Sequence, residues 1–262
     1  MDAIAAEIKK IPPVTRFLTI SLVSVSIPVF MNLISPYKVV YFWGAVSTKF
    51  EIWRIWSSFF LGSRGLSFIF ETIMLYRTSN ELEDGPFARK SSDYALQLFV
   101  ACGSIIITSI PLQTMLFLRP LLLCIVYLSS NLAPPGAQTS LYGLITIPIK
   151  YFPYALLGMD LLMAGPGAAA QAIPGAIVGH LWWMGVFGTE LGGTQGGVLT
   201  EWGRAPRWLR SWFGEDGSST TGRTLNSGGG VNVVPPRARA EEGANPNTTF
   251  GHRWGTGQRL GN

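Results

Sequence analysis

Apolar segments separated by shorter polar ones fill the chain as far as Thr189. A run of about 18 or more apolar residues is long enough to cross the hydrocarbon core of a bilayer as a helix. The pattern therefore predicts six membrane-spanning helices. Five lie at about residues 17–34, 59–76, 94–110, 112–129 and 173–189, and the fifth in chain order lies somewhere between residues 142 and 163. Because little more than Pro111 separates the third span from the fourth, these two are expected to form a tight hairpin.

Two of the six predicted spans are interrupted. The second contains Glu71, whose carboxylate is costly in a membrane unless it is paired or faces water. The fifth is broken by Pro148, Lys150 and Pro153, so the pattern does not fix its limits. The small residues from Gly165 to Gln171 predict a loop before the sixth span.

The segment before the first span is expected to lie on the membrane surface. In residues 1–14 three isoleucines recur at helical spacing with charged residues between them, which is typical of a short interfacial helix. Lys9, Lys10 and Arg16 precede or begin the first span, and the positive-inside rule places such residues in the cytosol. An even number of spans then returns the C-terminus to the cytosol.

Residues 192–262 divide into two segments of different composition. Residues 192–214 alternate arginine with tryptophan and predict a juxtamembrane amphipathic segment that binds anionic lipid. Residues 215–262 are rich in Gly, Ser, Pro and Asn and contain few large apolar side chains, so they are expected to be a disordered tail. The sequon that begins at Asn247 lies in this tail, where a cytosolic location would keep it from the glycosyltransferase.

Composition supports a membrane protein and argues against nucleic-acid binding. The chain is 48% hydrophobic and only 13% charged, well below the roughly 25% charge of soluble domains. Its net charge of +5 is spread over loops and the tail without a dense basic patch, so no nucleic-acid partner is expected.

A cation lies between two tryptophans just before the second predicted span. Trp53 and Trp56 flank Arg54, and the rings can anchor at the headgroup level while the guanidinium stacks or reaches the interface. An ordinary aromatic belt would give the same pattern, and spacing alone does not separate these interpretations.

The sixth predicted span combines a small-residue face with a histidine. Gly175 and Gly179 are four residues apart and so share one helix face, which lets a neighbouring helix approach to backbone contact. His180 follows them, and an intramembrane histidine is either a catalytic base or a polar passenger on a packing face.

Several ordered motifs resemble the Derlin family, the pseudoprotease branch of the rhomboid superfamily. They lie between Ile11 and Phe187, and include Ile11-Pro-Pro-Val-Thr-Arg16, Ile34-Ser-Pro36, Phe50-Glu-Ile-Trp-Arg54, Leu82-Glu83, Asp93-Tyr94 and the segment from Gly175 to His180. Near the C-terminus, Trp254-Gly-Thr-Gly-Gln-Arg-Leu260 is similar to the SHP box of many Derlins, with Trp254, Gly255, Gly257 and Leu260 at its key positions. That box usually begins with Phe, and Gly-rich chain ends without any function are common.

The resemblance implies an all-α, six-helix rhomboid-like bundle in residues 15–191, located in the endoplasmic reticulum membrane. It implies a role in the degradation of misfolded lumenal or membrane proteins, without a cofactor. Trp53-Arg54 would be the family's WR motif, and Gly175 with Gly179 its helix-packing motif. The implied partners are a valosin-containing-protein type AAA+ ATPase, bound by the SHP box, a membrane-embedded ubiquitin ligase complex, misfolded clients and the lipid bilayer. A homo-oligomer is one of the working units that the resemblance leaves open.

Proteolysis would need a serine nucleophile beside the histidine. Rhomboid proteases carry that serine at the start of the fourth span, where this chain reads Leu112-Gln-Thr-Met-Leu-Phe-Leu-Arg-Pro120. We therefore expect a pseudoprotease in which His180 makes a polar contact between helices. With only two histidines in the chain, no metal site is expected. The alternatives are a passive receptor that only tethers the ATPase and, more remotely, an active rhomboid-type intramembrane serine protease.

Overall fold

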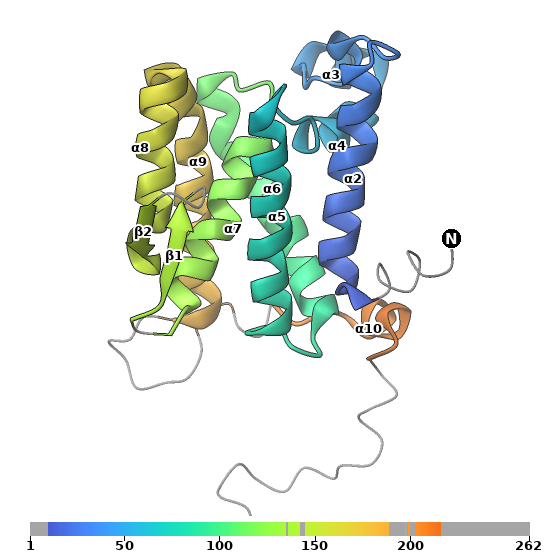
Figure 1. Ribbon diagram of the computed structural model, residues 1–262. Helices are drawn as coiled ribbons and strands as arrows, with labels where there is room; N and C mark the ends of the chain where they lie inside the picture. Colours follow the sequence, from blue (N-terminus) through green and yellow to red (C-terminus); the bar gives the residue numbers. More distant parts are fainter. Residues whose placement is uncertain are drawn as a thin grey trace, which may run out of the picture. The chain divides into compact units, whose positions relative to one another are not determined.

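The protein is a bundle of helices that run back and forth between two ends. The computed structural model describes residues 10–134, 136–141, 145–188, 197, 199 and 203–215 (Figure 1). Its longer helices are α2 (Pro13–Phe30), α5 (Leu66–Asp84), α6 (Ser91–Ser109), α7 (Leu118–Leu132), α8 (Phe152–Ala164) and α9 (Pro166–Trp182). Consecutive members of this set run in opposite directions (Figure 1). The prediction of an all-α bundle is confirmed, with one small β-hairpin added.

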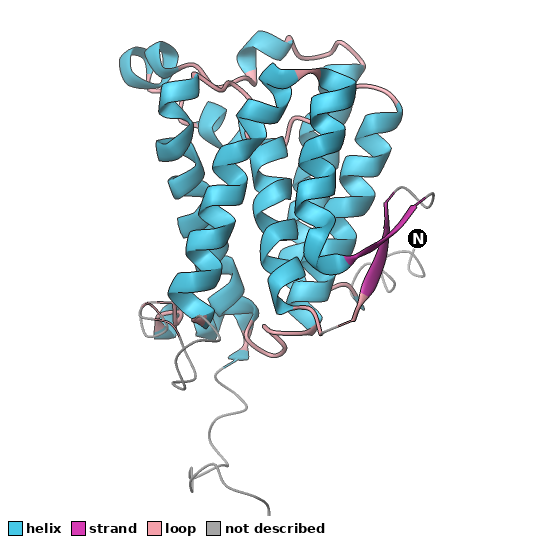
Figure 2. Ribbon diagram, turned by 90° about the vertical axis from the view of Figure 1, so that its left-hand side faces the viewer, coloured by secondary structure: helices cyan, strands magenta, loops and turns pink. Residues whose placement is uncertain are grey.

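Shorter elements cover the two ends of the bundle. Between α2 and α5 lie α3 (Trp43–Lys49) and α4 (Trp53–Phe59), next to the loops that join α6 to α7. At the other end, α10 (Arg207–Phe213) lies near the start of α6 (Figure 1). Strands β1 (Gln138–Leu141) and β2 (Ile145–Pro148) pair antiparallel beside the helices (Figure 2), with Thr139 opposite Ile147.

Helix α7 is the centre of the bundle. It packs against α9, α5, α8, α6 and α4, and Leu121, Ile125 and Leu128 on it are fully buried. Most residues of α7 are buried, as expected for a helix with neighbours on several sides. Arg119 lies in the first turn of this helix, so its guanidinium is brought among the surrounding helices.

The described helices differ in their ability to cross a membrane. By length and composition, Pro13–Phe30 and Ser91–Leu112 are each long and apolar enough to do so. Helix α7 has 15 residues and α8 has 13. At 1.5 Å per residue these helices are about 22 and 20 Å long, whereas the hydrocarbon core of a typical bilayer is about 30 Å thick.

The predicted limits of the second and fourth spans are wrong. Residues 59–65 belong to the end of α4 and a loop, and α5 continues beyond the predicted limit at residue 76 as far as Asp84. The fourth helix starts at Leu118 instead of residue 112, so a 3-10 turn (Ile110–Leu112) and an extended segment replace the tight hairpin. Hydropathy does not distinguish these loop residues from helical ones, because both segments are rich in apolar side chains.

The fifth span and the following loop also differ from the prediction. Strands β1 and β2 occupy residues 138–141 and 145–148, so α8 begins only at Phe152, after a 3-10 turn (Ile149–Tyr151). A short apolar run with β-branched residues fits a strand as well as a helix. The predicted loop at residues 165–171 is instead the first turn of α9, which follows Gly165 in a backbone conformation with φ of 86°.

Candidate functional site

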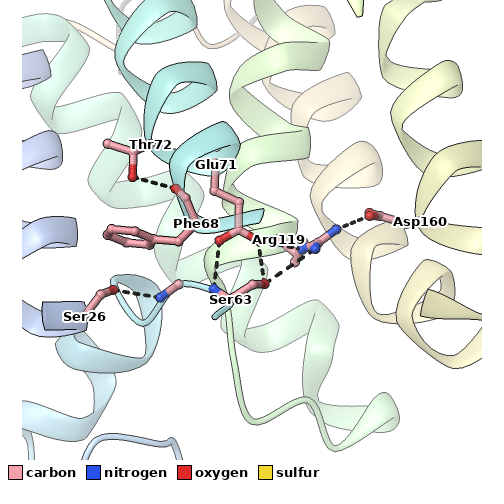
Figure 3. A network of polar contacts seen from close by, with 8 residues as sticks. Ser26, Ser63, Phe68, Glu71, Thr72, Arg119 and Asp160 are labelled. Atoms are coloured by element: carbon pink, nitrogen blue, oxygen red, sulfur yellow. Dashed lines mark hydrogen bonds and ion pairs between the residues drawn. The ribbon is translucent and has the colours of Figure 1, made fainter. Parts of the chain in front are cut away.

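A network of charged and hydroxyl groups joins α5, α7 and α8 (Figure 3). Arg119 of α7 lies at its centre, with its Nε 3.1 Å from Glu71 Oε1 of α5. The Nη1 of the same guanidinium donates to Asp160 Oδ1 of α8. One arginine therefore links two helices that each pack on α7.

Glu71 is the best satisfied member of the network. Its Oε2 accepts from the backbone N–H of Ser63 at 2.8 Å, and its Oε1 accepts from the hydroxyl of Ser63 at 2.6 Å. Its side chain is 8% exposed. The sequence predicted that this carboxylate must be paired or face water, and the structure shows it paired with donors from a loop and from α7.

The loop that holds Ser63 is in turn fixed to α2. Gly62 donates its backbone N–H to the hydroxyl of Ser26 at 2.9 Å (Figure 3). That hydroxyl donates to the carbonyl oxygen of Phe60 at 2.9 Å. A Cβ on Gly62 would lie 2.5 Å from the ring of Phe68 and 3.2 Å from Glu71 Oε2. The position therefore needs glycine so that the loop can approach Glu71.

The charged network borders a groove between α5 and α8. Two cavities of about 230 Å³ each lie there, and Phe70 and Met74 of α5 line both. Glu71, Arg119 and Asp160 line the second cavity, while residues of α7 form part of the wall of each. We call the surface formed by these two cavities the lateral groove.

Sequence reasoning had singled out Glu71 but not its partners. Arg119 and Asp160 also lie within apolar segments, so the same signal, an ionisable residue in a predicted span, would have found them. Their pairing depends on the crossing of α7 with α5 and α8, which periodicity does not reveal.

Gly175 and Gly179 lie on the face of α9 that contacts α7. A Cβ on Gly175 would lie 1.9 Å from the carbonyl oxygen of Pro120, and one on Gly179 would lie 2.9 Å from that of Cys124. Real Cβ contacts of that length do not occur with backbone atoms, so both positions require the absence of a side chain.

His180 is paired with α7. Its Nδ1 lies 2.9 Å from the hydroxyl of Tyr127, and the two rings meet edge to face with centroids 5.7 Å apart. Trp183 lies on the other side, with its ring centroid 6.0 Å from that of the histidine. The imidazole thus makes a polar contact between α7 and α9.

Arg54 holds the loop between α2 and α5. Its Nε donates to Glu51, and its Nη1 donates to the carbonyl oxygens of Tyr37 and Val40, the second at 3.2 Å. The neighbouring Trp53 is 60% exposed. In the predicted WR pair, Arg54 therefore stabilises the loop through hydrogen bonds to backbone carbonyl groups, while Trp53 faces outward.

Tyr41 connects the same loop to the segment before α7. Its backbone N–H donates to the carbonyl oxygen of Met115 at 3.1 Å, and its ring packs edge-on against Phe117. Burial raises the pKa of the Tyr41 phenol above its usual value, because the charged form would lose hydration. The phenol therefore stays neutral at physiological pH.

A second buried carboxylate, which sequence reasoning missed as a site, caps α2. Glu83 of α5 is 3% exposed and accepts from the backbone N–H groups of Val14 and Thr15 at 3.1 and 2.8 Å. It also accepts from the hydroxyl of Thr15 at 2.9 Å. The first N–H groups of a helix have no partner within the helix, so a carboxylate there satisfies them and complements the helix dipole.

The segment at residues 203–215 is attached to the start of α6. Asp93 accepts from the backbone N–H of Ala205 at 2.6 Å and forms an ion pair with Arg210 at 3.7 Å. Trp208 and Trp212 of α10 remain exposed, whereas Leu209 is buried. Residues 203–214 belong to the segment predicted to be amphipathic, and its binding to anionic lipid stays a prediction.

Comparison with known proteins decides the family. The model of the Der1-like family matches residues 11–198. The chain belongs to the Der1-like family. Derlins are multi-pass proteins of the endoplasmic reticulum membrane and rhomboid-like pseudoproteases with a role in endoplasmic-reticulum-associated degradation. This chain is therefore a polytopic membrane protein, and its resemblance to Derlins is confirmed.

Individual Derlins are similar over much of their length. Derlin-1 of Homo sapiens is 28% identical over 268 aligned residues, which cover 100% of this chain and 99% of the human one. Derlin-1 of Arabidopsis thaliana is 27% identical over 231 residues, or 87% of this chain and 84% of its own. Derlin-1.2 of Zea mays is 28% identical over 186 residues, or 70% of this chain and 75% of its own.

Some predicted features lie outside the described residues. These are most of the interfacial helix at residues 1–14, the tail beyond Glu215 and the SHP box with Trp254, Gly255, Gly257 and Leu260. Among the residues that the structure describes, no three His, Cys, Asp or Glu side chains gather as metal ligands would.

Proposed function

We propose that this Derlin is a non-catalytic component of endoplasmic-reticulum-associated degradation that helps misfolded lumenal or membrane proteins to cross or leave the membrane. The observation that carries the proposal is the lateral groove between α5 and α8. Both helices pack on α7, and Arg119 reaches from α7 to a carboxylate on each of them. A client segment entering sideways from the lipid would meet polar groups there, which lowers the cost of its own polar groups.

The lengths of the helices beside the groove support local thinning of the bilayer. Helix α8 is about 20 Å long, roughly 10 Å less than the hydrocarbon core of a typical bilayer. A span that is too short is accommodated by thinning the surrounding lipid. A thinner bilayer presents a shorter barrier to any polar segment that crosses it.

The contacts of α7 and α9 support a role without proteolysis. Helix α7 begins with Leu118-Arg119-Pro120, and the Arg119 side chain is engaged by Glu71 and Asp160. His180 shares its Nδ1 with the hydroxyl of Tyr127. A phenol is a poor nucleophile at neutral pH. A histidine that is hydrogen-bonded to a phenol has no serine to activate.

The distribution of basic residues supports cytosolic termini. Lys10 lies just before α2, and Arg89 and Lys90 directly precede α6, at the end of the bundle where α10 adds Arg207 and Arg210 (Figure 1). The opposite end carries Lys38, Lys49, Arg54 and Arg64, and Arg54 is paired there with Glu51. By the positive-inside rule the first of these ends is cytosolic.

In this orientation the tail reaches the cytosol, where its SHP box recruits a valosin-containing-protein type AAA+ ATPase. The membrane-embedded ubiquitin ligase complex and misfolded clients are the further partners of the bundle. In a homo-oligomer, a second copy of the chain contributes the other half of the path that a client takes across the membrane. Affinity purification in mild detergent, scored for ligase and ATPase, tests these assignments.

The proposal is tested by locking the lateral groove. Cysteines at Phe70 and Leu156, on opposite walls, are joined by a thiol-specific cross-linker after Cys102 and Cys124 have been replaced by alanine. Degradation of a misfolded membrane client should stop on cross-linking and resume with a cleavable linker after reduction. Unchanged client turnover in the locked protein would contradict lateral entry.

A passive tether is the alternative, in which the bundle only anchors the tail. If so, residues 201–262 grafted onto an unrelated membrane anchor should restore degradation in cells that lack this chain. Substitution of Arg54 should then have no effect on client turnover. The lateral-groove proposal expects the graft to fail.

A further inference from the structure

Three charged groups line the second cavity of the lateral groove, and their charges do not balance. Arg119 contributes one positive charge, and Glu71 and Asp160 contribute two negative ones, so their formal sum is −1. The other described residues that line this cavity, such as Met74, Leu123 and Met159, carry no charge. A net negative charge is therefore left beside an otherwise apolar surface.

The two carboxylates are not equivalent. Glu71 receives two hydrogen bonds from Ser63 in addition to the arginine, and its side chain is 8% exposed. Among the described residues, Asp160 is paired with Arg119 alone, through Oδ1, and its side chain is 18% exposed. The unbalanced charge is thus most accessible at Asp160, on the wall formed by α8.

The surroundings of Asp160 are suited to a membrane helix. Met163 follows it one turn later on α8, lines the same cavity and is 79% exposed. Across the groove, Phe70 and Ile73 of α5 line its cavities and are 36% and 54% exposed. Apolar side chains on both walls would contact the apolar part of a client helix, while the carboxylate lies between them.

A basic residue in a transmembrane helix is costly until it finds a partner. The ammonium of lysine and the guanidinium of arginine end flexible stems that can reach several ångströms sideways. A carboxylate within reach supplies a charge-assisted hydrogen bond, roughly twice as strong as a neutral one. An acidic client side chain would instead meet the surplus negative charge.

We propose that the lateral groove binds a basic side chain in the transmembrane segment of a client, with Asp160 as its acceptor. This inference rests on the proposed lateral entry of clients and specifies which clients the groove prefers. Arg119 and Glu71 are then positioning residues, since Arg119 orients the carboxylate of Asp160 and Glu71 orients Arg119. Membrane segments that carry Lys or Arg are preferred over wholly apolar ones and over those that carry Glu.

The test uses the full chain in phosphatidylcholine vesicles and three synthetic probes. Each probe is a Leu/Ala helix of about 21 residues, with Lys, Leu or Glu at its centre. Binding is read from quenching of a fluorophore attached through Ser67→Cys, at the rim of the cavity, in a background without Cys102 and Cys124. The Lys probe should bind about tenfold more tightly than the Leu probe, as expected for one charge-assisted hydrogen bond. The Glu probe should bind no more tightly than the Leu probe.

Two variants assign the effect to this carboxylate. Asp160→Asn should remove the preference, so that the Lys and Leu probes bind alike, and its thermal unfolding in detergent shows whether the variant is folded. Asp160→Glu should retain the preference. Asp84→Asn is the matched control, because it removes one negative charge from the far end of α5, where Asp84 accepts from Asn80.

The outcomes separate this inference from the function it rests on. Equal binding of the Lys and Leu probes to the native chain, or a Lys preference that survives Asp160→Asn, overturns the inference while lateral entry stands. Failure of every probe to bind overturns lateral entry together with the inference. Tighter binding of the Glu probe would show that the groove has the opposite charge preference.

Discussion

Gly175 of α9 lies directly against the carbonyl of Pro120 in α7, so closely that a Cβ would be 1.9 Å from the oxygen and 2.6 Å from the carbon. Pro120 follows Arg119, the centre of the charged network. The close approach of α9 therefore fixes the first turn of α7, and with it the position of the guanidinium. The first turn of α7 therefore couples the packing of α9 against α7 to the position of Arg119 in the lateral groove.

Gly175→Ala should destabilise the protein by about 2 kcal/mol or more, because the clash is with backbone atoms that no rotamer change can move. Unfolding in mild detergent measures the loss. Gly167→Ala on the same helix is the control, since a Cβ there has nothing within 4 Å. It should be neutral or slightly stabilising. Similar stability of the two variants would show that the helices are not packed as described.

Gly179→Leu should also destabilise the bundle and slow client turnover. Its Cβ alone would lie 2.9 Å from the carbonyl oxygen of Cys124 and from the Cβ of Tyr127. The larger side chain must push α9 away from α7 and break the contact between Tyr127 and His180. Turnover of a misfolded membrane client and unfolding in detergent are measured together, and native values for both would argue against a packed face.

Arg54→Lys should loosen the loop between α2 and α5 although the charge is kept. Lysine cannot reproduce the planar fork that donates to Glu51, Tyr37 and Val40 together. Amide hydrogen exchange at Val40 and Tyr41 should accelerate by about tenfold, the order expected for one lost charge-assisted hydrogen bond. Lys49→Gln, which changes an exposed cation of α3, should leave exchange as it is.

Glu83→Ala should cost about 2–3 kcal/mol of stability, because it leaves the buried N–H groups of Val14 and Thr15 without acceptors. Glu83→Gln should cost less, since the amide oxygen can still accept one of them. The exposed neighbour supplies a control, and Asp84→Ala should change stability by no more than about 0.5 kcal/mol. Thermal unfolding in detergent distinguishes the three variants.

Substituting both Trp254 and Leu260 with alanine should abolish co-purification of the AAA+ ATPase without affecting membrane insertion. These residues are the two apolar anchors of the SHP box predicted in the tail. Asn262→Ala, two residues beyond, is the control and should bind normally. Retained binding by the double variant would remove the SHP assignment. Asn247 offers a check on topology in the same protein, since a glycan there would place the tail in the lumen.

Much of the architecture follows from local properties of the sequence. Apolar runs long enough for a bilayer predict the helices of the bundle, because each run must bury or expose to lipid one continuous apolar surface. Gly175 and Gly179 could be assigned to one helix face from their spacing, and the requirement of Glu71 for a partner followed from the cost of an unpaired charge.

The residues at which helices begin and end could not be predicted from the apolar pattern alone. The segment around Ile147 is apolar and β-branched, so its pattern suits either a strand or part of a span, and pairing with Thr139 decides for the strand. The helix that follows is shortened as a result, and the short α8 is one of the features that support membrane thinning.

The sequence by itself determined that this is a helical membrane protein. It also determined that the carboxylate of Glu71 needs a partner and that Gly175 and Gly179 form a close-packing face. Only the tertiary structure decided that Arg119 forms ion pairs with both Glu71 and Asp160, and that Glu83 caps α2. The reason is that hydropathy and periodicity report only whether each face of a segment prefers water or an apolar environment. A charge pair depends on which turns of separate helices face each other, and that is set by the crossing of α7 with its neighbours.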